Sequence, residues 1–365
     1  MRTRRQALLA GLAGVSGCLG VSSAPRTNQE PVDAGEADAR IGFVGDVMLG
    51  RSVTDRWRGR TPTGVWGSTL DRLQRLDGLV ANLECCVSSR GEPWPDKAYY
   101  FRAAPEFAVP ALRAAGVTVA SLANNHVLDF GDIALGDTLR HLREAGVTPV
   151  GAGDDRSEAF QPGFVEAEGV TVATVGLTDQ WPAYAADEDS PGTAYLRLDP
   201  TVPSTRREVT EALDGVRESD PDLVVASLHW GPNWETEPDT TQETFARWLI
   251  DRGVDVVHGH SAHVLQGVEV YRGRPIVYDA GDFVDDYIHK DGFHNKHSAL
   301  FELVLRDGEL WGLEVVPVRI VEEAVELAGE EAAGWVRGAI RDRSAPYGTH
   351  IERAGDGLVI PLGAE

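Results

Sequence analysis

Ile41-Gly42-Phe43-Val44-Gly45-Asp46 is an apolar run that ends in a glycine and a carboxylate. The run predicts a buried strand, and Gly45-Asp46 predicts its end. Outward from it, short apolar runs alternate with helical runs, and a series of β segments follows. This order predicts an α/β protein with a mixed sheet system. The predicted strands are 41–44, 78–83, 117–121, 148–151, 170–177, 223–228, 254–257, 268–271, 275–278, 299–305 and 310–318, and the main predicted helices are 105–115, 133–145, 205–215, 241–253 and 321–341.

The chain divides into four predicted parts. Residues 1–17 form a targeting segment, and residues 18–39 are small, polar and acidic, which is typical of a flexible tether. Residues 40–320 contain no stretch typical of a linker, so we expect one domain there. Residues 321–365 are expected to form a helical tail.

The targeting segment carries Arg4-Arg5 ahead of a short apolar run, a pattern typical of twin-arginine export signals. Val15-Ser16-Gly17-Cys18 resembles a lipobox, in which Cys18 carries lipid after cleavage. The alternatives are a plain signal peptide and an uncleaved anchor with an incidental cysteine. The apolar run is shorter than the roughly 20 residues that span a bilayer. We therefore expect the protein on the outer face of the cell membrane, held by the lipid alone.

The charge of the chain is strongly negative. It has 57 acidic and 34 basic residues, a formal net charge of −23, and only three lysines, Lys97, Lys290 and Lys296. This balance is typical of haloarchaeal-type proteins, because salt at about 1 M shortens the Debye length to roughly 3 Å. An acidic protein from a GC-rich genome is the alternative. The charge argues against general binding of nucleic acid or anionic membranes, and three cysteines exclude a disulfide scaffold.

Polar side chains recur where the predicted strands end. Ligands of open α/β sheets gather at the carboxyl ends of the strands. Singly, each residue is typical of a cap or a turn. Together, carboxylate, amide and imidazole donors without a thiolate predict one or two divalent cations, with Mn, Fe, Zn and Mg left open. The residues concerned are Asp46, Glu84, Asn124, Asn125, His126, His229, His260, His263 and Asp282.

The order of these motifs resembles the capsule-synthesis CapA family over roughly residues 40–290. The resemblance rests above all on Ser121-Leu122-Ala123-Asn124-Asn125-His126 and on Gly259-His260-Ser261-Ala262-His263-Val264-Leu265-Gln266. The family is associated with production of poly-γ-glutamate capsules and is similar to calcineurin-like metallophosphoesterases. The resemblance implies a four-layer α/β/β/α sandwich with a metal site at the sheet ends.

The resemblance also implies roles for individual residues. Asp46 and His263 would bind a first metal, and Asn125, His229 and His260 a second. Glu84 stands where the related phosphoesterases have a bridging aspartate, and His126 would protonate the leaving group. Met48 stands where those enzymes have a histidine, and the last motif is His-x-x-His in place of His-x-His.

Three further residues are predicted to contact the substrate. Arg102 could bind a carboxylate or phosphate with both of its terminal nitrogens, although a surface ion pair is the alternative. Asn124 lies in the Asn-Asn-His run. Asp282 stands near the expected site, with a capping role as its alternative.

Three functions remain open at this point. The first is a metal-dependent hydrolase that makes or handles an extracellular anionic polymer such as poly-γ-glutamate. The second is a non-catalytic accessory that binds the polymer during export, with a capsule-synthesis membrane complex as partner. The third is an extracellular phosphoesterase that acts on small phosphate esters.

Overall fold

The computed structural model describes residues 37–363. The predicted targeting segment, Cys18 and nearly all of the predicted tether therefore lie outside the described residues. Within the described part of the chain, no helix combines the length and the apolar character that a membrane span requires.

The first sheet is built around β1 (Ala39–Val47), the strand predicted from residues 41–46. On one side of β1 lie β2 (Gly78–Leu83), β5 (Val119–Ser121) and β6 (Thr148–Val150), all parallel. On the other side lie the antiparallel strands β16 (His297–Arg306) and β17 (Glu309–Val321). The sheet is completed by β15 (Asp282–Val284), parallel to β1, and by β18 (Ala324–Leu327), β19 (Glu352–Ala354) and β20 (Gly357–Pro361).

The second sheet has a parallel centre and antiparallel edges. Its order is β13 (Val268–Tyr271), β14 (Arg274–Val277), β12 (Val256–His260), β11 (Leu223–His229), β9 (Val170–Thr178) and β8 (Gly163–Ala167). The four central strands, β9, β11, β12 and β14, are parallel. The two edge strands, β8 and β13, pair with β9 and β14 in the antiparallel sense.

The strands alternate between two apolar environments, which shows how the layers are stacked. In β1, Ile41 and Phe43 enter a core shared with the second sheet, while Val44 packs toward the opposite face. In β11, Val225 enters the shared core and Val224 packs outward. Because side chains alternate along a strand, both sheets are buried on both faces. The result is the predicted four-layer α/β/β/α sandwich.

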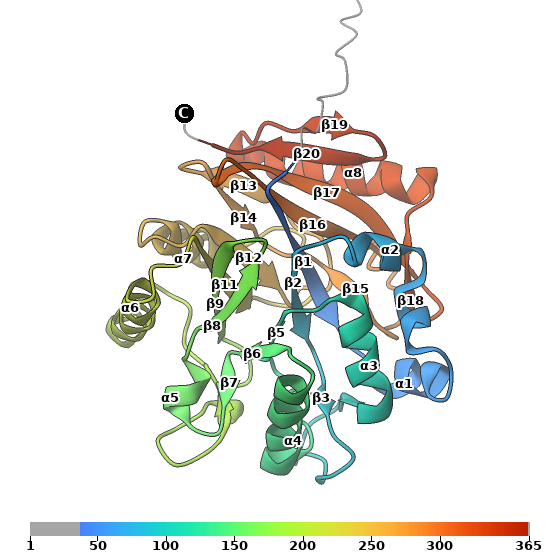
Figure 1. Ribbon diagram of the computed structural model, residues 1–365, viewed down its shortest axis with the longest axis vertical. Coiled ribbons are helices and arrows are strands. Elements are labelled where there is room, and N and C mark those ends of the chain that lie inside the picture. Colours follow the sequence, from blue (N-terminus) through green and yellow to red (C-terminus); the bar gives the residue numbers. More distant parts are fainter. Residues whose placement is uncertain (1–36, 364–365) are drawn as a thin grey trace, which may run out of the picture. The chain divides into compact units, whose positions relative to one another are not determined.

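Helices form the two outer layers (Figure 1). The first sheet is covered by α3 (Pro105–Ala115) and α4 (Gly131–Glu144), and the second by α6 (Pro203–Arg217) and α7 (Thr240–Ile250). A capping box between Asp239 and Gln242 fixes the start of α7. The remaining elements are α1 (Arg51–Trp57), η1 (Pro62–Thr69), α2 (Leu70–Leu73), β3 (Cys86–Val87), β4 (Arg102–Ala103), β7 (Ala152–Gly153), α5 (Arg156–Ala159), η2 (Pro182–Tyr184), β10 (Gly192–Thr193), α8 (Glu330–Ser344) and η3 (Ala345–Tyr347).

The segment after residue 320 differs from the predicted helical tail. Helix α8 begins at Glu330, whereas β18, β19 and β20 extend the first sheet. Glu322 and Glu323 have φ values of 50° and 57°. Two successive positive φ angles are the mark of a tight hairpin turn, so the chain turns back from β17 into β18 where a helix was expected. The spacing of side chains in this acidic run is compatible with a helix and with a strand hairpin, and the turn at Glu322-Glu323 produces the hairpin.

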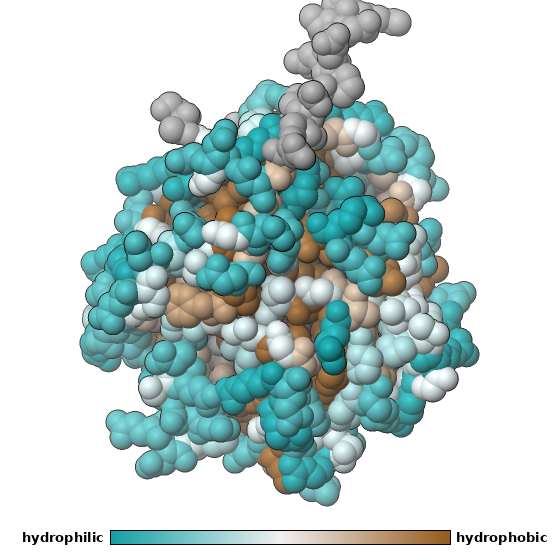
Figure 2. Space-filling view, viewed as in Figure 1, coloured by the Kyte–Doolittle hydropathy of each residue, from teal (hydrophilic) through white to brown (hydrophobic). Residues whose placement is uncertain are grey.

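The face of the molecule drawn in Figure 2 is largely hydrophilic. Figure 2 shows hydrophilic side chains over the outer elements of this face, with hydrophobic ones mostly between them. The cysteines at 85 and 86 are free and buried.

Candidate metal centre

The carboxyl ends of parallel strands from both sheets meet at one place. Asp46 lies near the end of β1 and Glu84 directly follows β2. His229 and His260 are the last residues of β11 and β12, and they are register partners. A β-bulge at Asp46 disturbs the pairing of β1 with both of its parallel neighbours, and such irregularities re-aim side chains.

Two groups of side chains could each hold a cation. The first, here called the imidazole group, is Asp46, His229 and His260; the second, the carboxylate group, is Asp46, Glu84, His263 and Asp282. In each group, the potential ligand atoms lie within 4.8 Å of one another, and every member is buried. Asp46 belongs to both groups. It therefore holds the shared position in which the resemblance led us to expect Glu84.

The imidazole group offers neutral nitrogen donors. The Nδ1 atoms of His229 and His260 are 3.0 Å apart, and His229 Nε2 lies 3.2 Å from Asn125 Oδ1. Burial lowers the pKa of His229 to about 3 and also lowers the pKa of His260 well below its usual value. Both rings are neutral near pH 7, the form in which imidazole binds metals. Asn125 stands at the edge of this group.

The carboxylate group concentrates negative charge around one imidazole. His263 Nδ1 lies 2.9 Å from Asp282 Oδ1 and 3.1 Å from Asp46 Oδ2. Burial disfavours a charged His263, but Asp282, Asp46 and Glu84 outweigh burial and raise its pKa. Burial, reinforced by Asp46, raises the pKa of Glu84 well above its usual value. Burial also raises the pKa of Asp282.

Orphaned oxygens show that a cation fits these residues. Oδ2 of Asp46 and Oδ2 of Asp282 are buried and accept no hydrogen bond. Buried polar atoms without a partner are costly, and the single Nδ1–H of His263 cannot satisfy both carboxylates. A divalent cation accepts carboxylate oxygens and imidazole nitrogens together. The donor set and its unmet oxygens therefore suit a metal centre.

The backbone around the centre is tightly constrained. A Cβ atom at Gly45 would lie 1.8 Å from the carbonyl oxygen of Gly281, so the segments that carry Asp46 and Asp282 touch through their main chains. Ser261 and His263 have φ values of 115° and 59°. Such strain in non-glycine residues is held only where the surroundings impose it. Here the carboxylate of Asp279 accepts hydrogen bonds from the amides of Ala262 and Gly281.

His126 stands beside the carboxylate group. Its Nδ1 lies 2.7 Å from Asp129 Oδ2, and its Nε2 lies 3.9 Å from Glu84 Oε1. The ring stacks on Phe101, with 3.7 Å between the ring centroids. Burial lowers the pKa of His126 to about 4, against the opposing effect of Asp129. The ring is thus neutral near pH 7, with Nδ1–H directed at Asp129 and Nε2 free toward Glu84.

The three predicted substrate contacts have different outcomes. Asn124 donates both amide hydrogens inside the protein, to Asn82 Oδ1 and the carbonyl of Leu83, so it positions neighbours and has none left for a ligand. Asp282 belongs to the carboxylate group. Arg102 stacks on Phe130, outside both groups, with its guanidinium carbon 3.8 Å from the ring centroid.

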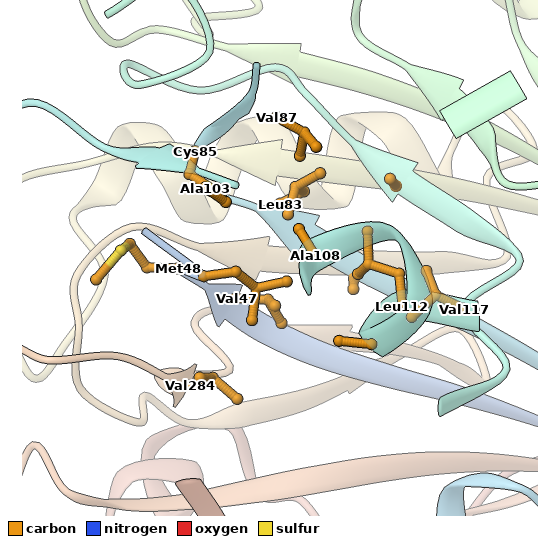
Figure 3. Packing of buried hydrophobic residues seen from close by; sticks show 14 of the residues in the cluster. Val47, Met48, Leu83, Cys85, Val87, Ala103, Ala108, Leu112, Val117 and Val284 are labelled. Carbon is orange, nitrogen blue, oxygen red and sulfur yellow. The ribbon is translucent and has the colours of Figure 1, made fainter. Parts of the chain in front are cut away.

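Met48 has no part in either group. It is fully buried in the apolar cluster that Figure 3 shows, with Val47 and Cys85. Its sulfur accepts a hydrogen bond from the amide of Gly50 at 3.1 Å. The position at which the resemblance to phosphoesterases implied a histidine is therefore a packing position in this chain.

Further supporting residues were missing from the predicted site. Asn82 donates to Asp46 at 2.7 Å, and Tyr287 donates to Glu84 at 2.8 Å. The buried Lys97 pairs with Asp129 and contacts the carbonyl of Asn125. The sequence did contain a signal for Asn82, because it is a polar residue inside an otherwise apolar strand. Lys97 and Tyr287 come from loops, where side-chain periodicity gives no guidance.

The family model and the relatives that are at least 30% identical in sequence agree on one family. The chain matches the family described as "Bacterial capsule synthesis protein PGA_cap" over residues 40–287. It is 33% identical to a probable polyglutamine synthesis accessory protein of Mycobacterium tuberculosis, over 87% of this chain and 94% of that protein. It is 34% identical to the capsule biosynthesis protein CapA of Bacillus anthracis, over 77% of this chain and 67% of that protein. A hypothetical protein from Thermus thermophilus, of known structure, is 16% identical, with a TM-score of 0.45 and coverage of 76% of this chain and 98% of that one. The matched residues of the family include every member of both groups.

Proposed function

The chain belongs to the bacterial capsule synthesis protein family PGA_cap, and from this premise we propose that it is a metal-dependent hydrolase acting on an extracellular polymer of the poly-γ-glutamate type. The observation that carries the proposal is the pair of ligand groups that share Asp46 beside His126. A structural cation needs only one closed set of ligands. Two adjoining sets next to a histidine–aspartate pair support chemistry on a bound substrate.

The residues of the two groups would hold the cations. Bound there, divalent cations polarise a carbonyl or phosphoryl oxygen and acidify a water molecule. The imidazole group, with Asn125 at its edge, suits Zn, Mn or Fe, whereas the carboxylate group suits harder ions such as Mn or Mg. Asn82 and Tyr287 hold the carboxylates of Asp46 and Glu84 in place through hydrogen bonds.

His126 would move the proton. The hydrogen bond from Nδ1 to Asp129 fixes the ring tautomer and leaves Nε2 facing the centre. Nε2 takes a proton from the water molecule as its oxygen bonds to the carbonyl carbon, and delivers that proton to the leaving nitrogen as the C–N bond breaks. Phe101 stacks on the ring and limits its rotation.

We also propose export and lipid anchoring, on the evidence of Arg4-Arg5 and Cys18. A lipid-anchored protein would meet the polymer at the outer face of the membrane. Cys18→Ala is expected to release the protein from the membrane fraction into the medium, and metabolic labelling with a lipid precursor checks the modification. Retention of the variant in the membrane fraction would contradict the anchor.

The central experiment measures metal content and cleavage in the same samples, in concentrated salt. Substrates are poly-γ-glutamate and p-nitrophenyl phosphate, and the variants are His126→Ala and, as a matched control, the exposed His350→Ala. Loss of a general acid–base group costs about 10²–10⁴-fold in rate, so His126→Ala should lose cleavage and keep its metal. A wild type that binds no divalent metal would refute the metal-dependent hydrolase, and a His126→Ala variant with wild-type cleavage would refute the role of His126.

A second candidate is a non-catalytic accessory that binds the polymer. The burial of Met48 in the apolar cluster favours it, because the centre lacks the histidine of the related phosphoesterases. The relative from M. tuberculosis is itself named a probable accessory protein. Polymer binding without cleavage by any metal form would select this function. Cleavage of p-nitrophenyl phosphate alone would select the extracellular phosphoesterase.

A further inference from the structure

A cavity of about 350 Å³ lies among α1, β4 and the loop after β3. Three of its lining residues are Arg51, Arg58 and Arg102, and Asp55 is its single lining carboxylate. This volume lies in the range of small-molecule sites. Three guanidinium groups on one cavity contrast with the net charge of −23 on the chain. We call it the arginine cavity.

A glycine brings the arginines together. A Cβ atom at Gly50 would lie 2.9 Å from both the amide nitrogen and the carbonyl oxygen of Arg102, so the turn from β1 into α1 packs directly on the main chain of β4. The next residue, Arg51, has φ of 49°, a conformation that costs energy for any residue with a side chain. The local fold thus accepts strain to place Arg51 at the cavity.

The three arginines differ in their existing partners. Arg51 forms a two-point ion pair with Asp286, and Arg58 pairs with Glu106 at 3.2 Å. Within residues 37–363, Arg102 pairs with no carboxylate. It lies flat on Phe130, and its Nη1 is 3.4 Å from the carbonyl oxygens of Arg90 and Gly91. Its guanidinium is therefore held in a fixed plane and has capacity to bind an anion.

One aromatic layer separates the arginine cavity from the metal centre. The Arg51 guanidinium carbon lies 4.9 Å from the ring centroid of Phe101, which also stacks on the ring of His126. The same guanidinium lies 5.8 Å from the ring centroid of Tyr287, which donates to Glu84. The arginine cavity and the metal centre are therefore neighbours, with Phe101 and Tyr287 between them.

We propose that the arginine cavity binds a free carboxylate of the polymer, on a residue adjoining the amide at the metal centre. The inference rests on the proposed function, because a γ-linked glutamate chain carries one free carboxylate on every residue. Guanidinium groups bind carboxylates through two parallel hydrogen bonds. Arg102, whose charge no carboxylate of the described residues offsets, thereby offers local attraction to a polyanion that the acidic surface repels. Phosphate binds guanidinium groups in the same way and is therefore the alternative ligand for the cavity.

Binding of γ-linked hexaglutamate to the full-length chain tests the proposal, with a chelator present so that metals do not contribute. The variants are Arg102→Gln, Arg102→Lys and, as a matched control, Arg113→Gln on the exposed side of α3. Loss of charged hydrogen bonds is expected to weaken binding by about 10- to 100-fold in Arg102→Gln. Arg102→Lys should bind hexaglutamate with intermediate affinity, because lysine keeps the positive charge but cannot donate two parallel hydrogen bonds. Arg113→Gln should match the wild type, and the hexapeptide with amidated carboxylates should bind all four proteins equally weakly.

Two results would overturn the proposal. One is equal binding of hexaglutamate by Arg102→Gln and Arg113→Gln. The other is tighter binding of inorganic phosphate than of hexaglutamate, lost in Arg102→Gln, which would make the cavity a phosphate site. Cleavage is measured separately with metal. If the wild type cleaves the polymer and Arg102→Gln binds hexaglutamate normally, the carboxylate site is refuted and the hydrolase is not. If Arg102→Gln weakens binding of hexaglutamate and the wild type does not cleave the polymer, the hydrolase is refuted and the carboxylate site is not.

Discussion

The imidazole group and the carboxylate group share Asp46 but prepare for a cation in opposite ways. In the imidazole group, burial keeps His229 and His260 neutral, so their lone pairs are available over a wide pH range. In the carboxylate group, protons substitute for the cation: the pKa values of Glu84, Asp282 and His263 are all raised. The kind of donor therefore determines whether a metal must displace protons when it binds.

The largest expected effect comes from the shared residue. Asp46→Asn removes the carboxylate common to both groups, so binding should weaken at both. Loss of an outer partner of a ligand costs about 10- to 100-fold in affinity, and loss of this ligand should cost more. Metal stoichiometry by elemental analysis checks the outcome, with the exposed Asp71→Asn as control. Full loading of Asp46→Asn would show that the groups do not depend on Asp46.

A smaller effect should separate the two groups. His260→Ala removes an imidazole from one group only, and His263→Ala removes the imidazole of the other. Each variant should lose one equivalent of metal, and the double variant should lose both. Calorimetric titration with Mn²⁺ resolves the equivalents, and circular dichroism confirms folding. If either single variant lost both equivalents, the two groups would be one site.

The pH dependence should then differ between these two variants. In His260→Ala, the remaining carboxylate group holds extra protons below its raised pKa values, and a cation must displace them. Its affinity should fall as the pH is lowered from neutral, by about tenfold per unit for each proton displaced. In His263→Ala, the imidazole group should be nearly constant over this range, because the pKa of His229 is about 3. Parallel pH profiles would contradict the assignment of protons.

The smallest effect is expected at Met48. Met48→Leu conserves volume in the apolar cluster, so the free energy of unfolding should change by less than about 1.5 kcal/mol. Metal content should stay at the wild-type value. Chemical denaturation and elemental analysis check both points. A loss of metal would make Met48 a ligand and would extend the carboxylate group toward a thioether.

Local patterns in the sequence predicted the strands, whereas the four layers and the roles of the candidate ligands were implied by the resemblance to the capsule-synthesis family. The apolar runs that begin at Ile41 and Leu223 are buried strands, and their polar ends converge as the rule for parallel sheets requires. The helix 105–115 was predicted to its ends, since Pro105 marks its start and Gly116 its stop.

The remaining features depend on tertiary contacts that no local pattern records. Asp46 belongs to both ligand groups, and the register irregularity of β1 lies at this residue. Asp282 reaches the centre through its pairing with Asp46, which joins residues far apart in the sequence. The expected helix after residue 320 was wrong at its start because the turn at Glu322-Glu323 has no glycine or asparagine to signal it.

The contact between Gly45 and Gly281 has a consequence for folding. Because two main chains touch there, the spacing of Asp46 and Asp282 is set by backbone and cannot relax by side-chain rotation. Folding must therefore gather these acids in a dry interior whether or not a cation is present. Ligands that bind only the native state stabilise it by about 1.4 kcal/mol for each tenfold excess over Kd. The domain should thus melt at a temperature set by the supply of divalent ions, and metal-starved cells should contain less of it.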